Sequence, residues 1–307
     1  MRRLGFGLLL VGSWWIAACT SSEVVVAHSV PLSTATQDVA EDELLDVGVV
    51  LFDPGVPEGE VPKEVVEELI REGTFVQIRR SESVYMSVLL RQTLQKTRNW
   101  GSVWISPKAT TAADVNIVGK ILHSDGDQLR LSVTATDSTG RVWLDEEQYE
   151  METAAGAFNR QRYPELDPYQ DASNEIANDL AAAQLELSGE DRRGVRTVTS
   201  LRYAADLSPE AFAGYVVEDK GEYALNRLPA DGDPMYDRTQ RVLRRGARVA
   251  EDLAHARVAA PRHLLSSTRF VYDYPMAAID FDGEAIAAEY RAAVDHGLRF
   301  LREAHRE

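Results

Sequence analysis

Residues 113–144, ADVNIVGKILHSDGDQLRLSVTATDSTGRVWL, decide the fold of this 307-residue chain. Apolar and polar residues alternate in three runs, at residues 115–121, 129–135 and 142–144. Two turn sequences separate the runs, Ser124-Asp125-Gly126-Asp127 and Asp137-Ser138-Thr139-Gly140, and Asp-Gly is a strong hairpin signal. Alternation with a period of two turns one side of each strand toward a core. The stretch therefore predicts a three-stranded antiparallel meander with one buried face.

Two further strands and two helices are predicted before the meander. Residues 45–52 and 102–105 are short apolar runs that predict strands, and the second half of the acidic segment 58–72 predicts a short helix. Apolar residues recur every three and four positions in residues 81–97, which predicts an amphipathic helix. Ser81 is expected to be the N-cap of this helix.

A second long helix is predicted after the meander. It is expected to begin at Asp167-Pro168, because proline is favoured at the first helical position. Its apolar stripe is formed by Tyr169, Ala172, Ile176 and Leu180. A sheet with two helices on one face is an α+β fold. We therefore predict an α+β domain over residues 44–187, with a mainly antiparallel sheet and helices packed on one face.

This order of elements resembles a periplasmic α/β domain. The resemblance rests on NWGSVWI at residues 99–105, ADVNIVGKIL at 113–122, a hairpin, LRLSVTATDSTGRVWL at 129–144 and a closing helix. The domain is shared by the curli-secretion lipoprotein, the lipoprotein activators of penicillin-binding proteins, the amino-terminal domain of the TolB protein and auxiliary lipoproteins of transporters. The resemblance implies an envelope protein and carries no catalytic signature.

The beginning of the chain resembles the signal sequence of bacterial lipoproteins. Met1-Arg2-Arg3 is positively charged, and residues 4–18 are uncharged and mostly apolar. This run is shorter than the roughly 20 residues that a membrane-spanning helix needs. Ile16-Ala17-Ala18-Cys19 resembles a lipobox, which implies that residues 1–18 are removed and that Cys19 carries a diacylglycerol and a palmitate-type acyl chain. An ordinary signal peptide that contains a cysteine is the alternative.

The lipid on Cys19 would anchor the protein to a membrane. Three acyl chains hold firmly where one holds only marginally. Thr20 occupies the position where aspartate usually retains a lipoprotein in the inner membrane, so the sorting rule favours the periplasmic face of the outer membrane in a Gram-negative host. Cys19 is the only cysteine, so no disulfide is expected. Residues 19–43, small and polar for the most part, predict a flexible tether.

Residues 188–307 predict a mainly helical C-terminal region. A short helix is expected from Ser208-Pro209 to residue 217, and a longer one from Asp233-Pro234 onward. The apolar side of the longer helix is expected to contain Met235, Val242, Val249 and Leu253. A final helix is predicted over residues 286–301, where apolar residues recur at helical spacing.

The longer of these helices carries the candidate partner-binding residues. Arg238, Arg241, Arg245 and Arg248 share one face at positions i, i+3, i+7 and i+10, and Arg244 lies beside them. The formal net charge of the chain is −16, so such a basic row is unusual here. Guanidinium groups bind carboxylates and phosphates as planar forks. The row predicts a docking face for an acidic partner or an anionic glycan, unless it pairs with the acidic segment 58–72 or is merely solvated.

Sequence motifs for catalysis or metal binding are missing. None of the six histidines stands at a metal-ligand spacing, and neither Gly-x-Ser-x-Gly nor a glycine-rich phosphate loop occurs. Asp125 and Asp127 are expected to be turn residues rather than calcium ligands. Trp104 and Trp143 are expected to pack against the sheet rather than to form a binding patch. We therefore expect no cofactor, no metal and no enzymatic activity.

These observations favour a non-enzymatic assembly or regulatory adaptor in the cell envelope. The expected partners are the membrane, through Cys19, and an envelope protein, whereas the acidic composition disfavours nucleic acid. Two alternatives remain from the sequence. The chain could be an oligomeric component of a secretion or lipid-transport complex, with self-association through its helical part. The less favoured alternative is a cell-wall hydrolase.

Overall fold

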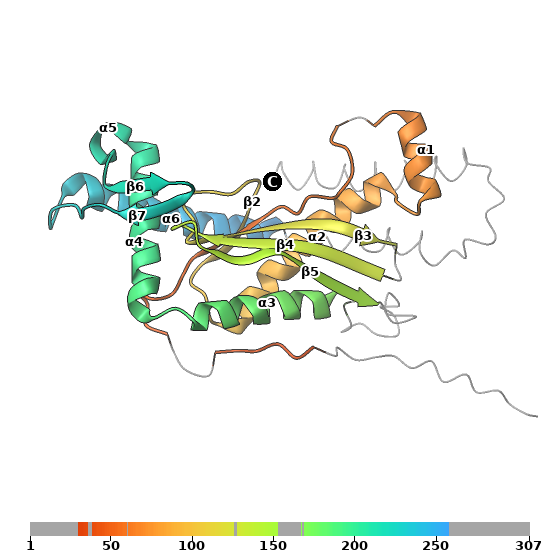
Figure 1. The fold of residues 1–307 in the computed structure, drawn as a ribbon, viewed down its shortest axis with the longest axis horizontal. Helices are drawn as coiled ribbons and strands as arrows, with labels where there is room; N and C mark the ends of the chain where they lie inside the picture. The colour runs from red at the N-terminus through yellow and green to blue at the C-terminus, as the bar shows by residue number, and fades with distance from the viewer. Residues whose placement is uncertain are drawn as a thin grey trace, which may run out of the picture.

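The computed structural model describes residues 30–35, 39–59, 61–125, 128–152, 167 and 169–257, and their side chains as far as residue 246. Cys19, Pro168 and the helix predicted over residues 286–301 lie outside the described residues. The described chain folds around one five-stranded sheet, which Figure 1 shows at the centre of the molecule.

The sheet combines the predicted meander with two parallel strands. Its strand order is β2-β1-β3-β4-β5. The strands are β1 (Val47–Val50), β2 (Val103–Ser106), β3 (Val115–Ser124), β4 (Gln128–Asp137) and β5 (Val142–Glu152). The long pairings β3–β4 and β4–β5 are antiparallel, as predicted, and β1 pairs in parallel with both β2 and β3. Sequence alone did not show that β1 enters between β2 and β3.

Two long helices cover one face of the sheet, which confirms the predicted fold class. Helices α2 (Val76–Thr97) and α3 (Gln170–Leu185) pack against each other, and their apolar sides form the core with the buried face of the strands. The predicted stripe of the second helix is buried throughout, at Tyr169, Ala172, Ile176 and Leu180. Burial of these side chains is what holds the helix on the sheet.

Helix α2 begins earlier than predicted. It starts at Val76 after the N-cap residue Phe75, and Val76 and Ile78 are buried. Ser81 therefore lies inside the helix, where its hydroxyl donates to the carbonyl oxygen of Gln77 at 2.9 Å. The prediction of Ser81 as the N-cap is wrong, because the first turns are held by burial of their own apolar residues rather than by a serine cap.

A buried polar network joins α2 to the end of β3 and the start of α3. The Arg79 guanidinium donates to the carbonyl oxygen of Ser124 at 3.0 Å, and its Nε lies 3.6 Å from Glu82 Oε2. Glu82 Oε1 accepts hydrogen bonds from Ser124 Oγ at 3.0 Å and from the Tyr169 hydroxyl at 3.2 Å. Because these groups are buried, their partners come from the protein rather than from bulk water.

Gly119 allows the core to close around Phe52. A Cβ atom at residue 119 would lie 2.3 Å from the Phe52 ring, closer than real contacts allow. The ring is buried on β3, and the backbone of Phe52 is held by the Ser87 hydroxyl at 3.0 Å. The glycine in the alternating sequence of β3 is therefore a packing requirement.

Part of the segment predicted as a tether lies against the domain. Asn178 of α3 accepts from the backbone N–H of Ser33 at 2.8 Å and donates to the carbonyl oxygen of Pro31 at 3.0 Å. Asn174 donates to the carbonyl oxygen of Val30 at 2.8 Å, and the N–H of Ala35 donates to Thr97 at 2.8 Å. Residues 30–35 are therefore fastened to α2 and α3.

Between residues 189 and 257 the chain is mostly helical, and it also forms a hairpin that was not predicted. It contains α4 (Gly189–Leu207), α5 (Pro209–Phe212), a hairpin of β6 (Val216–Asp219) and β7 (Glu222–Leu225), and α6 (Pro234–Arg257). The helix predicted to reach residue 217 ends at Phe212, because Gly214 adopts a φ of 81° and the chain turns into the hairpin. Val195 of α4 belongs to the main core, so this helix is packed on the sheet domain.

Candidate functional site

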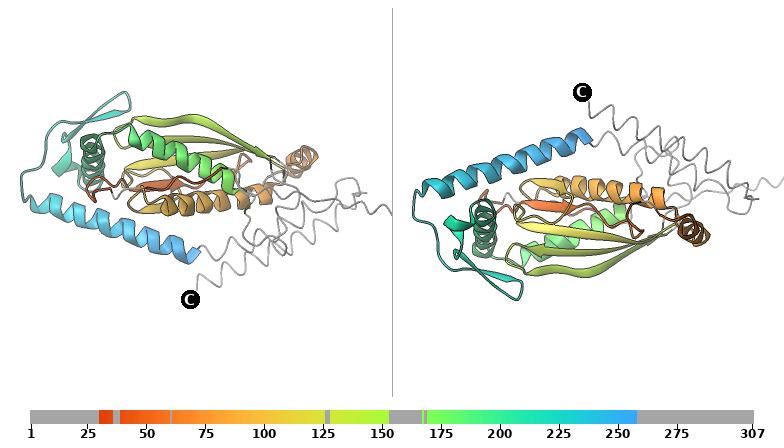
Figure 2. Two further views of the ribbon diagram at one scale, coloured as in Figure 1. Left: turned by 90° about the horizontal axis from the view of Figure 1, so that it is seen from below. Right: turned by 90° about the horizontal axis from the view of Figure 1, so that it is seen from above.

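Helix α6 covers the β2 edge of the sheet. It contacts β2 and α4, and both views in Figure 2 place it on the side opposite β4 and β5. Asp233 caps the helix start by accepting from the N–H groups of Met235 and Tyr236 at 2.8 and 3.1 Å, at the predicted position. A helix over an edge strand hides its unpaired backbone groups from other chains.

The packed side of α6 is not the side predicted from its apolar residues. The half-buried Tyr236 ring lies 6.2 Å from the ring of Phe212, Thr239 is buried, and Leu243 is half-buried. By contrast, Met235 is 46% exposed and Val242 is 44% exposed. The prediction that these two residues mark the packed side is wrong, because Tyr236 packs against residues of α4 and α5 and Thr239 is buried on the same side of α6. The side chains of Val249 and Leu253 lie outside the described residues.

The arginine face of α6, formed by Arg238, Arg241 and Arg245, points away from the domain. Residues in an α-helix are about 100° apart, which puts the face roughly opposite Thr239 and Leu243. All three side chains are exposed. The backbone of α6 continues through Arg248, whose side chain lies outside the described residues. The structure therefore presents the first three arginines of the predicted row to solvent.

The described residues provide no carboxylate partner for the arginine face. Arg238, Arg241 and Arg245 make no hydrogen bond or ion pair with any described side chain. The acidic segment that could have paired with them forms α1 (Lys63–Arg71), which lies at the far end of the domain from the start of α6 (Figures 1 and 2). In α1, Glu67 pairs with Lys63 at 3.8 Å. Internal pairing with residues 58–72 is not found among the described residues.

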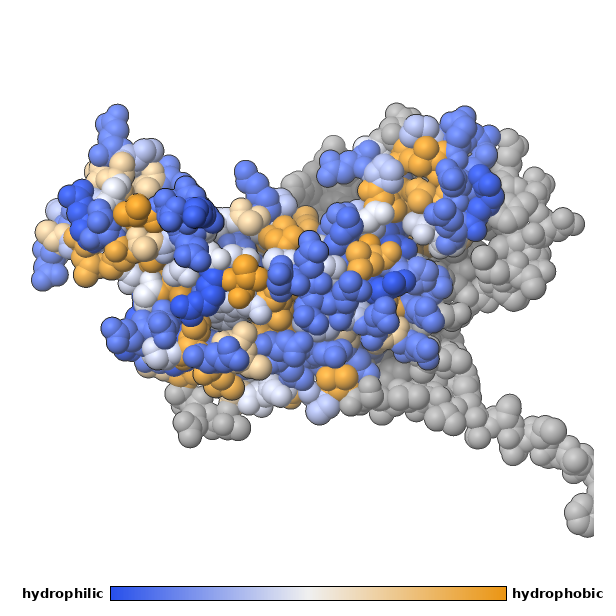
Figure 3. Space-filling model, viewed as in Figure 1, coloured by the Kyte–Doolittle hydropathy of each residue, from blue (hydrophilic) through white to orange (hydrophobic). Residues whose placement is uncertain are grey.

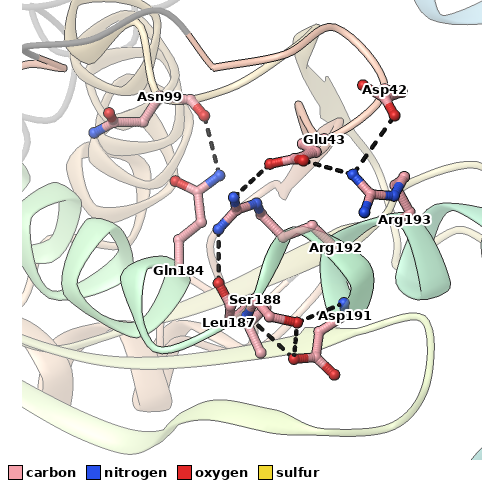
Figure 4. A network of polar contacts seen from close by, with 9 residues as sticks. All are labelled: Asp42, Glu43, Asn99, Gln184, Leu187, Ser188, Asp191, Arg192 and Arg193. Carbon is pink, nitrogen blue, oxygen red and sulfur yellow. Dashed lines mark hydrogen bonds and ion pairs between the residues drawn. The ribbon is translucent and has the colours of Figure 1, made fainter.

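Two arginines of α4, unlike those of the arginine face, are paired with a carboxylate among the described residues. Figure 4 shows Arg192 and Arg193 converging on Glu43, at 2.6 Å and 2.5 Å. The Arg192 hydrogen bond and the charge of both guanidinium groups hold the pKa of the Glu43 carboxyl below its usual range. Arg192 also donates to the carbonyl oxygen of Leu187 at 2.7 Å. This cluster fastens residue 43 to the start of α4.

The cluster at Glu43 was not found by sequence reasoning. A local signal for its helix exists, because Ser188 and Asp191 form a capping box in which the Ser188 hydroxyl accepts from the Asp191 N–H at 3.1 Å. The capping box predicts where α4 begins. It does not predict Glu43, which is distant in sequence, as the partner of the arginines.

A pair of carboxyl groups lies beneath α4 at the end of the sheet. Asp114 Oδ2 accepts from the Asp46 N–H at 2.7 Å, and Asp46 Oδ1 accepts from the Ser102 N–H at 2.7 Å. Burial, followed by the negative charge of Asp46, raises the pKa of Asp114 to about 7. Burial also raises the pKa of Asp46. Because the carboxyl oxygens bind backbone N–H groups where β1, β2 and β3 begin, we interpret the pair as structural.

The other sequence-based expectations concern metals and tryptophans. Among the described residues, no group of three or more His, Cys, Asp or Glu side chains could hold a metal ion. Asp125 accepts from the Gln128 N–H at 2.8 Å, as a turn residue does, and Asp127 lies outside the described residues. Trp104 is buried, and Trp143 packs at 6.1 Å from Trp100, so both contribute to packing, as predicted.

On the face drawn in Figure 3, the described residues offer charge rather than a large apolar patch. On the face in Figure 3, hydrophilic side chains predominate among the described residues and hydrophobic ones form small groups. Single exposed apolar residues are normal on soluble domains. None of the described helices is long and apolar enough to cross a membrane. The arginine face is therefore our candidate functional site.

Comparisons with known proteins do not assign the chain. No protein-family model matches it, and no curated protein matches it. The candidate site consequently rests on its own chemistry and geometry.

Proposed function

We propose that the protein is a non-enzymatic adaptor of the cell envelope, anchored to the periplasmic face of the outer membrane through lipid on Cys19. Its docking surface is the arginine face of α6, which binds an acidic surface on an envelope partner. The observation that carries the proposal is the exposure of three aligned guanidinium groups, at Arg238, Arg241 and Arg245, without a carboxylate partner among the described residues.

Electrostatics supports this mode of action. The chain as a whole carries a formal charge of −16, so an acidic surface is repelled by the chain overall and attracted to the row of positive charge on the arginine face. Guanidinium groups on one rigid helix bind carboxylates as forks and so fix the orientation of the partner. The lipid would restrict the search to the membrane surface, which raises the effective concentration of an anchored partner.

Site-specific crosslinking in cells tests the proposal. A photo-crosslinking amino acid replaces Val242, which is 44% exposed beside the arginines, or Leu185, which is 82% exposed on α3 and serves as the control position. We expect one dominant envelope protein to be captured from residue 242 and not from residue 185. Cys19→Ser should abolish this capture, because the protein is then no longer concentrated at the membrane.

Charge-removing variants separate the arginine face from general surface charge. Changing Arg238, Arg241 and Arg245 together to glutamine should reduce the capture about tenfold, as expected if three exposed ion pairs contribute roughly 1.4 kcal/mol in total. The matched control changes three exposed lysines of other elements, Lys63, Lys96 and Lys108, to glutamine. Equal losses in both triple variants, or unchanged capture by Cys19→Ser, would contradict the proposed function.

A further inference from the structure

The edge of the sheet opposite α6 is strongly acidic. On β5, which is the edge strand, Asp145, Glu146, Glu147, Glu150 and Glu152 are all exposed. Only Glu150 forms an ion pair with a described residue, at 3.4 Å from Arg130. We call these five residues the acidic edge.

Helix α3 adds more negative charge beside the acidic edge. The hydroxyl of Tyr149 on β5 donates to Asp179 of α3 at 2.9 Å, so the two elements are in direct contact. Burial, followed by the charges of Asp179 and Asp171, raises the pKa of the nearby Glu175 carboxyl. The described residues thus leave an excess of negative charge on this side of the domain.

The arginine face and the acidic edge cannot meet within one molecule. The strand order puts β2 and β5 at opposite edges, and α6 packs beside β2; both views in Figure 2 show this separation. Residues 145–152 of a strand extend over about 23 Å and residues 238–245 of a helix over about 10 Å, so the arginine face fits within the length of the acidic edge. The two surfaces can therefore neutralise each other only between molecules.

Contacts in which two copies meet through the same surface, either the arginine face or the acidic edge, are disfavoured. Two β5 strands side by side would bring carboxylates opposite each other, which destabilises strand pairing. Two α6 helices facing each other would juxtapose their arginines. A symmetric dimer through either surface is therefore opposed by charge, whereas a contact between unlike surfaces is favoured by it.

From this geometry we infer that the partner of the arginine face is a second copy of this chain, bound through its acidic edge. The inference rests on the proposed function, because it names the partner of the same docking surface. Each copy would use the arginine face toward one neighbour and the acidic edge toward the other. Such head-to-tail contacts form a closed ring if the rotation between copies closes, and an open filament if it does not.

Sedimentation velocity of the full-length chain, lipidated and in neutral detergent, tests the inference. We expect the average mass to rise with protein concentration at low ionic strength and to fall when salt is added, because salt screens exposed charges. Reversing the arginine face (Arg238→Glu, Arg241→Glu and Arg245→Glu) should weaken self-association at least tenfold. Reversing the acidic edge (Asp145→Arg, Glu147→Arg and Glu152→Arg) should do the same.

Mixing the two charge-reversed variants is the decisive measurement. Each variant alone presents like charges on both surfaces, but in the mixture every surface again finds an opposite charge. Association should therefore reappear only in the mixture. The matched control reverses three exposed glutamates of α1 and its C-cap, Glu64→Arg, Glu68→Arg and Glu72→Arg, and should associate like the unmodified chain. Circular dichroism of each variant verifies that it is folded.

Three results would overturn the inference. The first is a monomer at every concentration and ionic strength. The second is a mixture that does not associate although both variants are folded. The third is flotation of the chain lacking Cys19 with vesicles of anionic phospholipid, lost on reversal of the arginine face, without any self-association. If crosslinking from residue 242 captures a different envelope protein while the chain stays monomeric, the proposed function stands and only this inference fails.

Discussion

The carboxyl pair beneath α4 predicts an unusual dependence of stability on pH. The Asp114 side chain is 3% exposed, and its pKa is raised from 3.8 to about 7 by burial and then by Asp46. Between these two pH values the folded chain holds a proton that the unfolded chain has released. The free energy of unfolding therefore decreases as pH rises through this range, and this loss is complete above the folded pKa.

The size of this effect follows from the shift. Each pKa unit corresponds to about 1.4 kcal/mol, so Asp114 should cost the folded state about 4 kcal/mol near pH 8 relative to its protonated form. Asp46, whose pKa is also raised, contributes in the same direction, and the two carboxyls titrate as a coupled pair. Arg196 opposes both shifts through its positive charge, and hydrogen bonds from Thr199 and the Asp46 N–H also oppose the shift at Asp114.

Asp114→Asn isolates this contribution. The amide oxygen can still accept the Asp46 N–H, but the side chain no longer loses a proton. We expect the variant to be more stable than the unmodified chain by about 4 kcal/mol near pH 8 and by only about 2 kcal/mol near pH 5, because ionisation of Asp114 in the unfolded chain already begins at its ordinary pKa of 3.8. Urea unfolding followed by circular dichroism, at several pH values from about 5 to about 8, measures the difference.

The control is Asp145→Asn on β5, since it makes the same change of charge at an exposed position.

Carboxyls with lowered pKa, such as Glu43 and Asp191, contribute stability that is present above their unfolded pKa values of 4.5 and 3.8 and is lost as pH falls. These two carboxyls therefore change the free energy of unfolding mainly below pH 5, outside the pH range of the experiment. A free energy of unfolding that stays constant or increases between pH 5 and pH 8, or an Asp114→Asn variant with the same slope as the unmodified chain, would refute the reasoning.

Other predictions concern packing and capping, and urea unfolding checks each of them. Gly119→Ala should lower the free energy of unfolding by about 1–3 kcal/mol because its methyl group overlaps the Phe52 ring. The loss should be smaller in a Phe52→Leu background, and equal losses in both backgrounds would contradict a direct overlap. Glu82→Ala should cost about 3–5 kcal/mol because it leaves the charge of Arg79 buried without its carboxylate; a cost below about 1 kcal/mol would show that the pair is not needed. Ser188→Ala should cost about 1 kcal/mol through loss of the capping box, and Ser188→Thr, which keeps the hydroxyl, should recover most of it.

The structure departs from the sequence predictions where a partner distant in sequence decides the outcome. The start of the α6 helix was predicted correctly, but its packed side was not, because Tyr236 packs against residues of α4 and α5 and Thr239 is buried while Val242 stays exposed. The helix predicted to start at Ser81 begins at Val76 because its first turns are buried. The predicted helix to residue 217 gives way to a hairpin whose Tyr223 N–H bonds to Thr139 at 2.7 Å.

The sequence by itself determined what depends on local periodicity. Alternation in β3 and β4, turn residues between the strands, the apolar stripe of α3 and the arginine row of α6 were all readable, because side-chain direction follows from residue spacing within one element. Only the tertiary structure decided that β1 lies between β2 and β3, that Asp46 and Asp114 share a buried site, and that the arginine face and the acidic edge lie at opposite edges of the sheet. These features depend on which surfaces pack together over long separations in the chain, and residue spacing does not encode those contacts.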